Sequence, residues 1–342
     1  MEKYSFTFIN KNHISKGKMY EDCDQTLKKN GFHVFEFVNG CFIKKIYLYF
    51  KALFISISFK RKSVFFIQYP HKFMLSLFYF TKFIFVIKNI KTILFIHDIE
   101  ALRWEAGNKK LILKEIGIIR KFDYVICHNQ KMKSWLVSYG LDEKRIFSLN
   151  LFDYLIDDKI IWKKRIGNQI AIASNLSVKK SKYVYKLPIF QDVVFNLYGP
   201  NYETCVKQAN VHYFGSMVEK ELIQKINGKF GLVWDGDSIE TCSGNIGHYL
   251  QYNNPFKVSM YIAAGLPVIV WDKSALADFV NENNIGITVN NLLSLDFHLK
   301  KINEKDYAVM TENVRKLQKK VISGYFLSFV LKEVLKNIED NI

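Results

Sequence analysis

The sequence has few cysteines and lacks the common nucleotide-binding motifs. Its five cysteines are scattered with no C-x-x-C pair, so neither a zinc site nor a disulfide framework is expected, and a reducing cytosol fits best. Neither G-x-G-x-x-G nor G-x-x-x-x-G-K-[ST] occurs, which excludes the dinucleotide fingerprint and the P-loop. The N-terminus lacks a signal-peptide pattern, and no apolar run approaches the roughly 20 residues of a spanning helix.

Acidic residues are scarce relative to basic ones. The 342 residues include 49 Lys and Arg against 32 Asp and Glu, a formal net charge of +17. This excess predicts an anionic partner, which could be nucleic acid, a phospholipid surface or a phosphorylated substrate. No recognisable DNA- or RNA-binding module is present, so a nucleic-acid partner is not expected. The 49% hydrophobic content is that of a globular protein, and the length allows two domains.

Strand-like runs alternate with helix-like segments through both halves of the chain. In the first half these runs are residues 4–9, 32–38, 62–68, 92–96, 124–127 and 146–149. In the second half they are residues 169–173, 194–198, 212–214, 230–234, 268–271 and 286–289. Such alternation is typical of parallel, doubly wound sheets. We therefore predict an α/β protein with two Rossmann-like domains that face a cleft.

A polar, charged stretch at residues 157–167 marks the expected domain boundary. We predict an N-terminal domain over residues 1–160 and a C-terminal domain over residues 161–320. Residues 321–342 are expected to form a C-terminal helix that packs back toward the N-terminal domain.

Two apolar segments of the first half, residues 41–59 and 73–87, contain interspersed lysines. A basic helix rich in Phe and Ile can lie on a membrane surface. A helix that packs on the core while its lysines reach solvent is an equally good interpretation. The sequence leaves both open.

The most informative stretch is residues 230–272. A buried strand is predicted at its start and is followed by a polar loop that includes Asp235 and Asp237. A helix is then expected to open with Asn254 as its cap and Pro255 in its first turn. Ligands of open α/β sheets lie beyond the carboxyl ends of the strands, where helix N-termini point. Lys257, next to the unpaired backbone N–H groups of that turn, would suit a diphosphate.

Small or amide residues follow the other strands of the second half, at Asn175, Gly199 and Gly215. Each is compatible with ordinary turn chemistry, but together they let backbone N–H groups approach a ligand. Asp235 and Asp237 form a D-x-D pair that could hold Mg²⁺ on a phosphate. Because a lysine is expected to neutralise the diphosphate there, we predict a role in organising the sugar or the loop instead.

An acidic cluster follows a strand of the first half. His97, Asp98 and Glu100 lie at the carboxyl end of the predicted strand 92–96. An acid at this edge could take a proton from an attacking hydroxyl group. The alternative is a structural His-Asp pair at the start of a helix.

Five segments together resemble a known family. They are LFIHDIEALRW, CHNQKM, ASNLS, FGLVWDGDSIETCSG and YLQYNNPFKVSMYIAAGLPVIVWDKSALADFV. They resemble bacterial galactofuranosyltransferases of O-antigen and capsule assembly, notably the β-1,6 type. They are more distantly similar to the streptococcal glucosyltransferases that extend GlcNAc on serine-rich adhesins. The resemblance covers most of residues 92–289.

The resemblance implies a GT-B glycosyltransferase that uses a UDP-sugar and has no essential metal or other cofactor. It places Asn175 and Lys257 near the diphosphate, at the helix that Asn254 and Pro255 open. It also implies site residues of two further kinds. The nucleoside pocket is expected at Tyr198, Gly199, Phe214 and Gly215, and the donor-sugar loop at Asp235, Asp237, Thr241 and Ser243. Asp98 would be the general base, with His97 and Glu100 beside it.

Retaining members of the wider GT-B group often carry Glu-x7-Glu before the small-residue helix, but Tyr252 and Met260 stand here. Inversion is therefore expected. The best interpretation is transfer of galactofuranose from UDP-galactofuranose to a lipid-diphosphate-linked glycan, by a cytoplasmic protein on the inner face of the plasma membrane. A homo-oligomer stays open.

Two alternatives remain. One is a UDP-glucose- or UDP-GlcNAc-dependent transferase that acts on a glycoprotein or glycan. The other is a non-catalytic acceptor-binding subunit, which would be expected to have lost the polar loop and Lys257.

Overall fold

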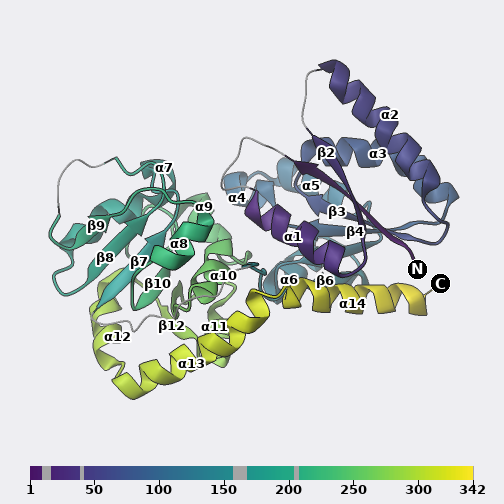
Figure 1. The fold of residues 1–342 in the computed structure, drawn as a ribbon. Helices are drawn as coiled ribbons and strands as arrows, with labels where there is room; N and C mark the ends of the chain where they lie inside the picture. Colours follow the sequence, from purple (N-terminus) through teal and green to yellow (C-terminus); the bar gives the residue numbers. More distant parts are fainter. Residues whose placement is uncertain (10–16, 39–41, 157–167, 204–207, 342) are drawn as a thin grey trace. The chain divides into compact units, whose positions relative to one another are not determined.

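The structure is a computed structural model that describes residues 1–9, 17–38, 42–156, 168–203 and 208–341. The chain forms two compact units (Figure 1). The first unit combines Met1–Asn150 with Gly324–Ile342, and the second is Leu151–Ser323. The predicted boundary at residues 157–167 lies outside the described residues.

The first unit is built on a parallel sheet of six strands in the order β2-β1-β3-β4-β5-β6. The strands are β1 Lys3–Ile9, β2 His33–Val38, β3 Val64–Tyr69, β4 Lys91–Ile96, β5 Tyr124–Cys127 and β6 Ile146–Ser148. Strands β3 and β5 are buried along their whole length. This explains why they consist of continuous apolar runs, since helices cover both faces of a parallel sheet.

Helices of the first unit cover both faces of this sheet. They are α1 Lys18–Lys29, α2 Phe42–Ser58, α3 Lys72–Ile87, α4 Glu100–Glu105, α5 Lys109–Ile119, α6 Gln130–Ser138 and α14 Tyr325–Asp340, with the 3-10 turn η1 Glu143–Arg145. The connection from β1 to β2 runs one way along the sheet and the next two run the other way. Right-handed crossovers therefore place α1 on one face and α2 and α3 on the other.

The C-terminal helix α14 belongs to the first unit. It contacts α1 (Figure 1). The amide of Asn30, the C-cap of α1, donates to the Ser328 hydroxyl at 2.8 Å. Its apolar stripe, which includes Leu327, Val330 and Leu331, is buried. In the described part of the chain, no helix combines the length and apolar character needed to cross a bilayer.

The second unit is also built on six parallel strands, in the order β12-β11-β10-β7-β8-β9. The strands are β7 Gln169–Ala173, β8 Val194–Tyr198, β9 Val211–Tyr213, β10 Phe230–Val233, β11 Val268–Trp271 and β12 Gly286–Val289. Both predicted sets of strands are confirmed to within two residues at each end, and so is the doubly wound α/β class. In this sheet the strand order reverses between β7 and β10.

Helices and turns of the second unit complete the fold. They are α7 Val178–Ser181, η2 Lys182–Ile189, α8 Glu219–Lys225, α9 Gly244–Tyr249, α10 Phe256–Ala263, α11 Ala277–Glu282, η3 Leu292–Ser294, α12 Leu295–Lys301 and α13 Glu304–Val321. Helix α9 lies within the stretch that was expected to be a polar loop throughout.

Tyr261 fixes helix α10 against the sheet. Its hydroxyl accepts from the Ala173 N–H at 2.8 Å and donates to the Leu232 carbonyl at 3.2 Å, which ties the helix to β7 and β10. A Cβ at Gly231 would lie 2.3 Å from the Tyr261 ring, so this strand position needs glycine. The contacts hold the first turn of α10 beside the carboxyl end of β10.

Candidate active site

The acidic cluster of the first unit lies where predicted, between β4 and α4. Helix α4 begins at Glu100 with Ile99 at its N-cap, so Asp98 comes just before the helix. The Asp98 carboxylate accepts a hydrogen bond from the Arg103 guanidinium. The two side chains are 22% and 27% exposed, so the carboxylate is held in place and still reaches solvent. Glu100 is exposed.

Unlike Asp98, His97 is buried. Its Nε2 lies 2.7 Å from the Gln68 Oε1, and because that oxygen can only accept, Nε2 carries the proton. Burial lowers the pKa of His97 well below its usual value, and nearby His128 adds to this shift. The imidazole is therefore neutral near pH 7.

Gln68, which is buried, and Asp24, which is partly buried, extend this arrangement, and the sequence reasoning missed both. The Gln68 amide donates to one Asp24 carboxylate oxygen at 2.7 Å, and the Thr7 hydroxyl bonds to the other. Burial raises the pKa of Asp24 to about 7, although the Thr7 hydrogen bond opposes the shift. One signal was available, because Thr7 and Gln68 are polar residues near the carboxyl ends of apolar strands.

Glu115 occupies the N-terminus of α4. Its carboxylate accepts from the backbone N–H groups of Glu100 at 3.0 Å and Ala101 at 2.7 Å, and from the Tyr69 hydroxyl at 2.6 Å. Burial raises the pKa of Glu115, although the hydrogen bonds that its carboxylate accepts oppose this shift. Because Glu115 accepts from the first N–H groups of α4, it fixes the start of the helix and, through it, Asp98 and Arg103.

The second unit brings the carboxyl ends of β7 and β8 into close contact. Gly199 has a φ of +135°, and a Cβ there would lie 1.8 Å from the Ser174 carbonyl oxygen. The Gly199 N–H donates to the Gly215 carbonyl at 2.9 Å, which joins the ends of β8 and β9. Asn175 Oδ1 accepts from the Ser177 N–H and the Asn201 amide, both at 3.1 Å. Its oxygen is thus engaged within the loop.

An exposed aromatic ring lies at the same edge. Phe214 is 47% exposed and stacks on the buried Tyr198, with ring centroids 5.0 Å apart and an interplanar angle of 12°. The Tyr198 hydroxyl accepts from the Asn227 N–H at 3.0 Å. Tyr198 therefore supports Phe214 from below, and the outer face of Phe214 is the one available for stacking.

Lys257 forms an ion pair that the sequence reasoning did not anticipate. Its ammonium lies 2.9 Å from Asp235 Oδ1 and donates to the Trp234 carbonyl at 3.0 Å. The Lys257 and Asp235 side chains are 13% and 9% exposed. These contacts use two of the three N–H donors of the ammonium group. Asp237, the second member of the D-x-D pair, is exposed, so the two carboxylates have different surroundings.

Glycines fold the segment after β10 back on itself. Gly236 has a φ of +106°, and a Cβ there would lie 2.2 Å from the Ser243 carbonyl oxygen. The Ser243 hydroxyl accepts from the Asp237 N–H at 3.3 Å. Thr241 lies between these two residues in the chain and is half-buried, and Cys242 is buried.

The start of helix α10 differs by one residue from the prediction. Pro255 is the N-cap, with φ −62° and ψ 127°, and no side chain caps the helix. Asn254 is buried and precedes the cap, so its assignment as the capping residue was wrong. Lys257 is the second residue of the helix, as expected for a cation beside the first turn.

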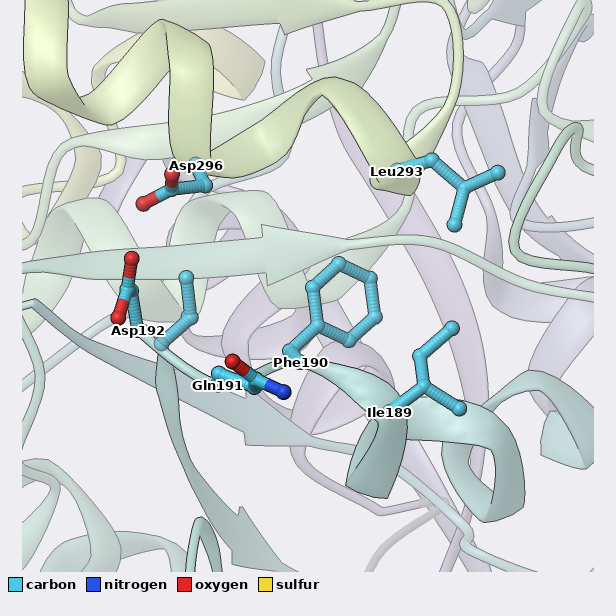
Figure 2. Close-up of a pocket in the computed structure, with 7 residues that line it drawn as sticks. Ile189, Phe190, Gln191, Asp192, Leu293 and Asp296 are labelled. Atoms are coloured by element: carbon cyan, nitrogen blue, oxygen red, sulfur yellow. The ribbon is translucent and has the colours of Figure 1, made fainter.

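A pocket of about 240 Å³ in the second unit lies elsewhere (Figure 2). It is lined by Phe190, Val193 and Leu293 among others, just before β8 begins. Asp192 and Asp296 line it too, and Lys300 bridges both carboxylates. Because β8 begins at Val194, the pocket lies at the amino end of the sheet, opposite the edge where ligands of such folds bind.

Comparison with known proteins identifies relatives along most of the chain. The model for the N-terminal domain of glucosyltransferase 3-like proteins matches residues 7–151, and the model for their C-terminal domain matches residues 170–334. The chain is 35% identical to the β-1,6-galactofuranosyltransferase WbbI of Escherichia coli (strain K12), over 71% of each chain. It is 26% identical to glucosyltransferase 3 of Streptococcus parasanguinis, over 72% of this chain and 70% of that one.

Solved structures show the same fold at low sequence identity. The apo lipopolysaccharide outer core galactosyltransferase WaaB superposes with a TM-score of 0.61 at 10% identity, over 99% of this chain and 100% of that one. A trehalose-6-phosphate synthase superposes with a TM-score of 0.59 at 9% identity, over the whole of both chains. With two parallel doubly wound sheets and matches to both domains, the chain is a GT-B glycosyltransferase that belongs to the glucosyltransferase 3-like family.

Proposed function

We propose that the protein transfers a hexosyl unit from a UDP-sugar, with galactofuranose from UDP-galactofuranose as the best candidate. The acceptor is a sugar hydroxyl of a lipid-diphosphate-linked repeat unit in O-antigen or capsule synthesis. The observation that carries this proposal is the arrangement of Lys257 and the first turn of α10 beside the strand-order reversal of the second sheet. The relative from Escherichia coli, named a galactofuranosyltransferase, supports the choice of donor.

In this proposal the diphosphate binds where β7 and β10 end. The third N–H of Lys257 and the first backbone N–H groups of α10 donate to phosphate oxygens, and the partial positive charge of the helix N-terminus adds to this attraction. Asn175 donates from its amide nitrogen, because its oxygen is already engaged. The same groups stabilise the negative charge of the departing diphosphate.

The nucleoside occupies the edge formed by the ends of β8 and β9. The base stacks on Phe214, whose far side rests on Tyr198. Gly199 and Gly215, which are half-buried and carry no side chain, bring the backbone close to the ribose. The segment from Asp235 to Ser243, with Asp237 and Thr241, then contacts the donor sugar.

Asp98 acts as the general base in this proposal. It removes the proton of the acceptor hydroxyl, which attacks the anomeric carbon as the bond to UDP breaks, so the configuration inverts. Arg103 orients the carboxylate. The buried neutral His97 supports the segment beside it. Met260, at a position where retaining relatives often carry Glu, is buried and has no carboxylate to offer.

We propose that no metal ion is required. The Asp235 carboxylate is paired with an ammonium group, and a carboxylate so neutralised attracts a divalent cation less strongly. Lys257 and the helix N-terminus supply the positive charge that a metal would otherwise bring to the diphosphate. Activity that survives chelation by EDTA is the expected result.

The family match also supports a second candidate, transfer of glucose or GlcNAc to a glycan or glycoprotein. Glucosyltransferase 3 of Streptococcus parasanguinis and that of Streptococcus gordonii are both 26% identical to this chain. A panel of UDP-galactofuranose, UDP-galactopyranose, UDP-glucose and UDP-GlcNAc, assayed for hydrolysis or transfer, separates the two. Turnover of UDP-galactofuranose alone supports the first, and turnover of UDP-glucose or UDP-GlcNAc supports the second.

Because the acceptor carries a lipid, we place the reaction at the cytoplasmic face of the plasma membrane, with the protein as a peripheral component. A non-catalytic acceptor-binding subunit would turn over none of the four donors. Stabilisation of the protein by UDP, compared with DNA at equal concentration, tests whether the anionic partner is a nucleotide sugar.

A further inference from the structure

Helices α2 and α3 are apolar on the faces they bury and also on the faces they expose. In α3 the buried face includes Leu77, Phe78 and Phe85. The exposed face includes Phe83, Val86 and Ile87, which are 56%, 70% and 63% exposed. A helix that is apolar all round normally has its second face covered too.

Helix α2 continues this surface. Its residues Phe50, Phe54 and Ile57 are 52%, 69% and 53% exposed, and their spacing of four and three places them on one stripe. The two helices pack against each other (Figure 1). The Tyr49 hydroxyl donates to Ser76 at 2.7 Å, and the ring of Tyr49 lies edge-on to Phe80 at 5.2 Å. We call the exposed side chains of α2 and α3 the apolar face.

The charge of this region identifies what covers the face. From Phe37 to His97 the sequence contains ten Lys and Arg and no Asp or Glu. Lys45 in α2 is exposed, as are Lys60, Arg61 and Lys62, which follow the helix. Lys60 is paired with Glu2 at 2.7 Å, and Lys45, Arg61 and Lys62 add further exposed positive charge beside the apolar face. An apolar face bordered mainly by basic residues is complementary to a surface with acyl chains and negative head groups. A second copy of the chain would bring the same positive charge, which opposes self-association.

From these observations we infer that the apolar face of α2 and α3 docks the protein on an anionic phospholipid bilayer. The aromatic and aliphatic side chains enter the boundary between head groups and acyl chains, and the bordering lysines and arginines contact the anionic head groups. This inference deepens the proposed function and rests on it, because a lipid-linked acceptor is confined to a membrane surface and the enzyme must reach it there.

The test is co-sedimentation of the full chain with phosphatidylcholine vesicles, with and without phosphatidylglycerol, at low and high salt. Wild type should bind the anionic vesicles, and salt should weaken that binding. Phe54→Glu combined with Phe83→Glu should reduce it by about tenfold or more, because two charges then oppose insertion. Phe297→Glu is the matched control, since Phe297 is 57% exposed but belongs to the second unit.

Three results would overturn the inference: no vesicle binding by wild type, equal binding by the double variant, or an equal loss in Phe297→Glu. A dimer of wild type that the double variant abolishes, without vesicle binding, would identify a second copy as the occupant and overturn it too. Unchanged thermal midpoints would establish that the variants fold.

Hydrolysis of UDP-sugars without vesicles separates this inference from the proposed function. If the protein hydrolyses UDP-sugars but does not bind vesicles, the docking surface is rejected and the proposed function is not. Vesicle binding by a protein that hydrolyses no UDP-sugar rejects the proposed function and leaves the docking surface supported.

Discussion

The two sheets of this protein have six parallel strands each, but their carboxyl edges are built differently. At the edge of the first sheet, the partly buried Asp24 and the buried Gln68 and His97 form a chain of hydrogen bonds, and Asp98 lies beside it. At the edge of the second sheet, glycines bring the strand ends together and Lys257 pairs with Asp235. In the proposed function, the first edge removes a proton and the second edge binds the diphosphate. Each prediction below tests this division.

Asp98→Asn should have the largest effect. If the first edge performs only the proton transfer, the variant should lose transfer by about 10²- to 10⁴-fold, because Asn cannot accept the proton. The affinity for UDP, measured by calorimetry, should stay within about twofold of wild type by the same argument, since the proposed UDP site is on the other unit. Asp142→Asn, an exposed carboxylate of the same unit, is the control and should keep full activity. Normal turnover in Asp98→Asn would remove Asp98 from its proposed role.

Lys257→Met should have the converse effect. It should weaken UDP binding by at least about tenfold and destabilise the protein by about 3 kcal/mol, since Asp235 is left buried without its partner. The measurements are calorimetry with UDP and chemical denaturation.

The double variant Lys257→Met with Asp235→Asn separates these two effects. It should recover stability, because no unpaired charge remains, but it should not recover UDP affinity. Recovery of UDP affinity would mean that Lys257 acts only by neutralising Asp235.

The pH dependence of the free energy of unfolding tests the hydrogen-bonded chain of Asp24, Gln68 and His97 at the first edge. The pKa of Asp24 is about 7 in the folded protein, above its ordinary value of 3.8, so the folded state holds a proton that the unfolded state has lost between these pH values. The contribution is fully present below pH 3.8 and is lost as pH rises toward 7. The slope is at most about 1.4 kcal/mol per pH unit.

Asp24→Asn mimics the protonated carboxyl group and should remove this dependence. The measurement is the difference in unfolding free energy between wild type and variant, from pH 4 to pH 7, which cancels the titration of other groups. A difference that does not change with pH would show that Asp24 is ionised in the folded protein throughout.

Phe214→Ala should have the smallest effect. Loss of a stacking ring should weaken UDP binding by about tenfold, which corresponds to about 1.4 kcal/mol. Phe297→Ala, another exposed ring of the second unit, is the control and should leave the affinity unchanged. Equal affinities of Phe214→Ala and wild type would place the base elsewhere.

Much of the fold could be predicted from the sequence because buried parallel strands are short continuous apolar runs. QIAIA at 169–173 and VIVW at 268–271 illustrate this, since each matches its strand without error. Helix α9 was missed because Gly244 and Gly247 disfavour a helix in isolation. Close packing within the folded protein explains the glycine, since a Cβ at Gly247 would lie 2.5 Å from the Cys242 carbonyl carbon.

The start of α10 was misplaced for a local reason. Pro255 has a φ of −62°, which suits a first helical turn, and its ψ of 127° is what puts it outside the helix. The sequence restricts φ at proline but not ψ, so a pattern with Asn before Pro fits either position. This error did not affect the prediction that Lys257 lies in the first turn of α10.

The sequence by itself determined the order and type of the strands, the polar residues that follow them and the cation in the first turn of α10. These depend on apolar runs and turn residues that are neighbours along the chain. Tertiary structure alone decided that Lys257 pairs with Asp235, 22 residues away, and that Gln68 reaches Asp24, 44 residues away. The ionisation of a buried carboxyl group depends on how much water its surroundings exclude, and folding determines those surroundings.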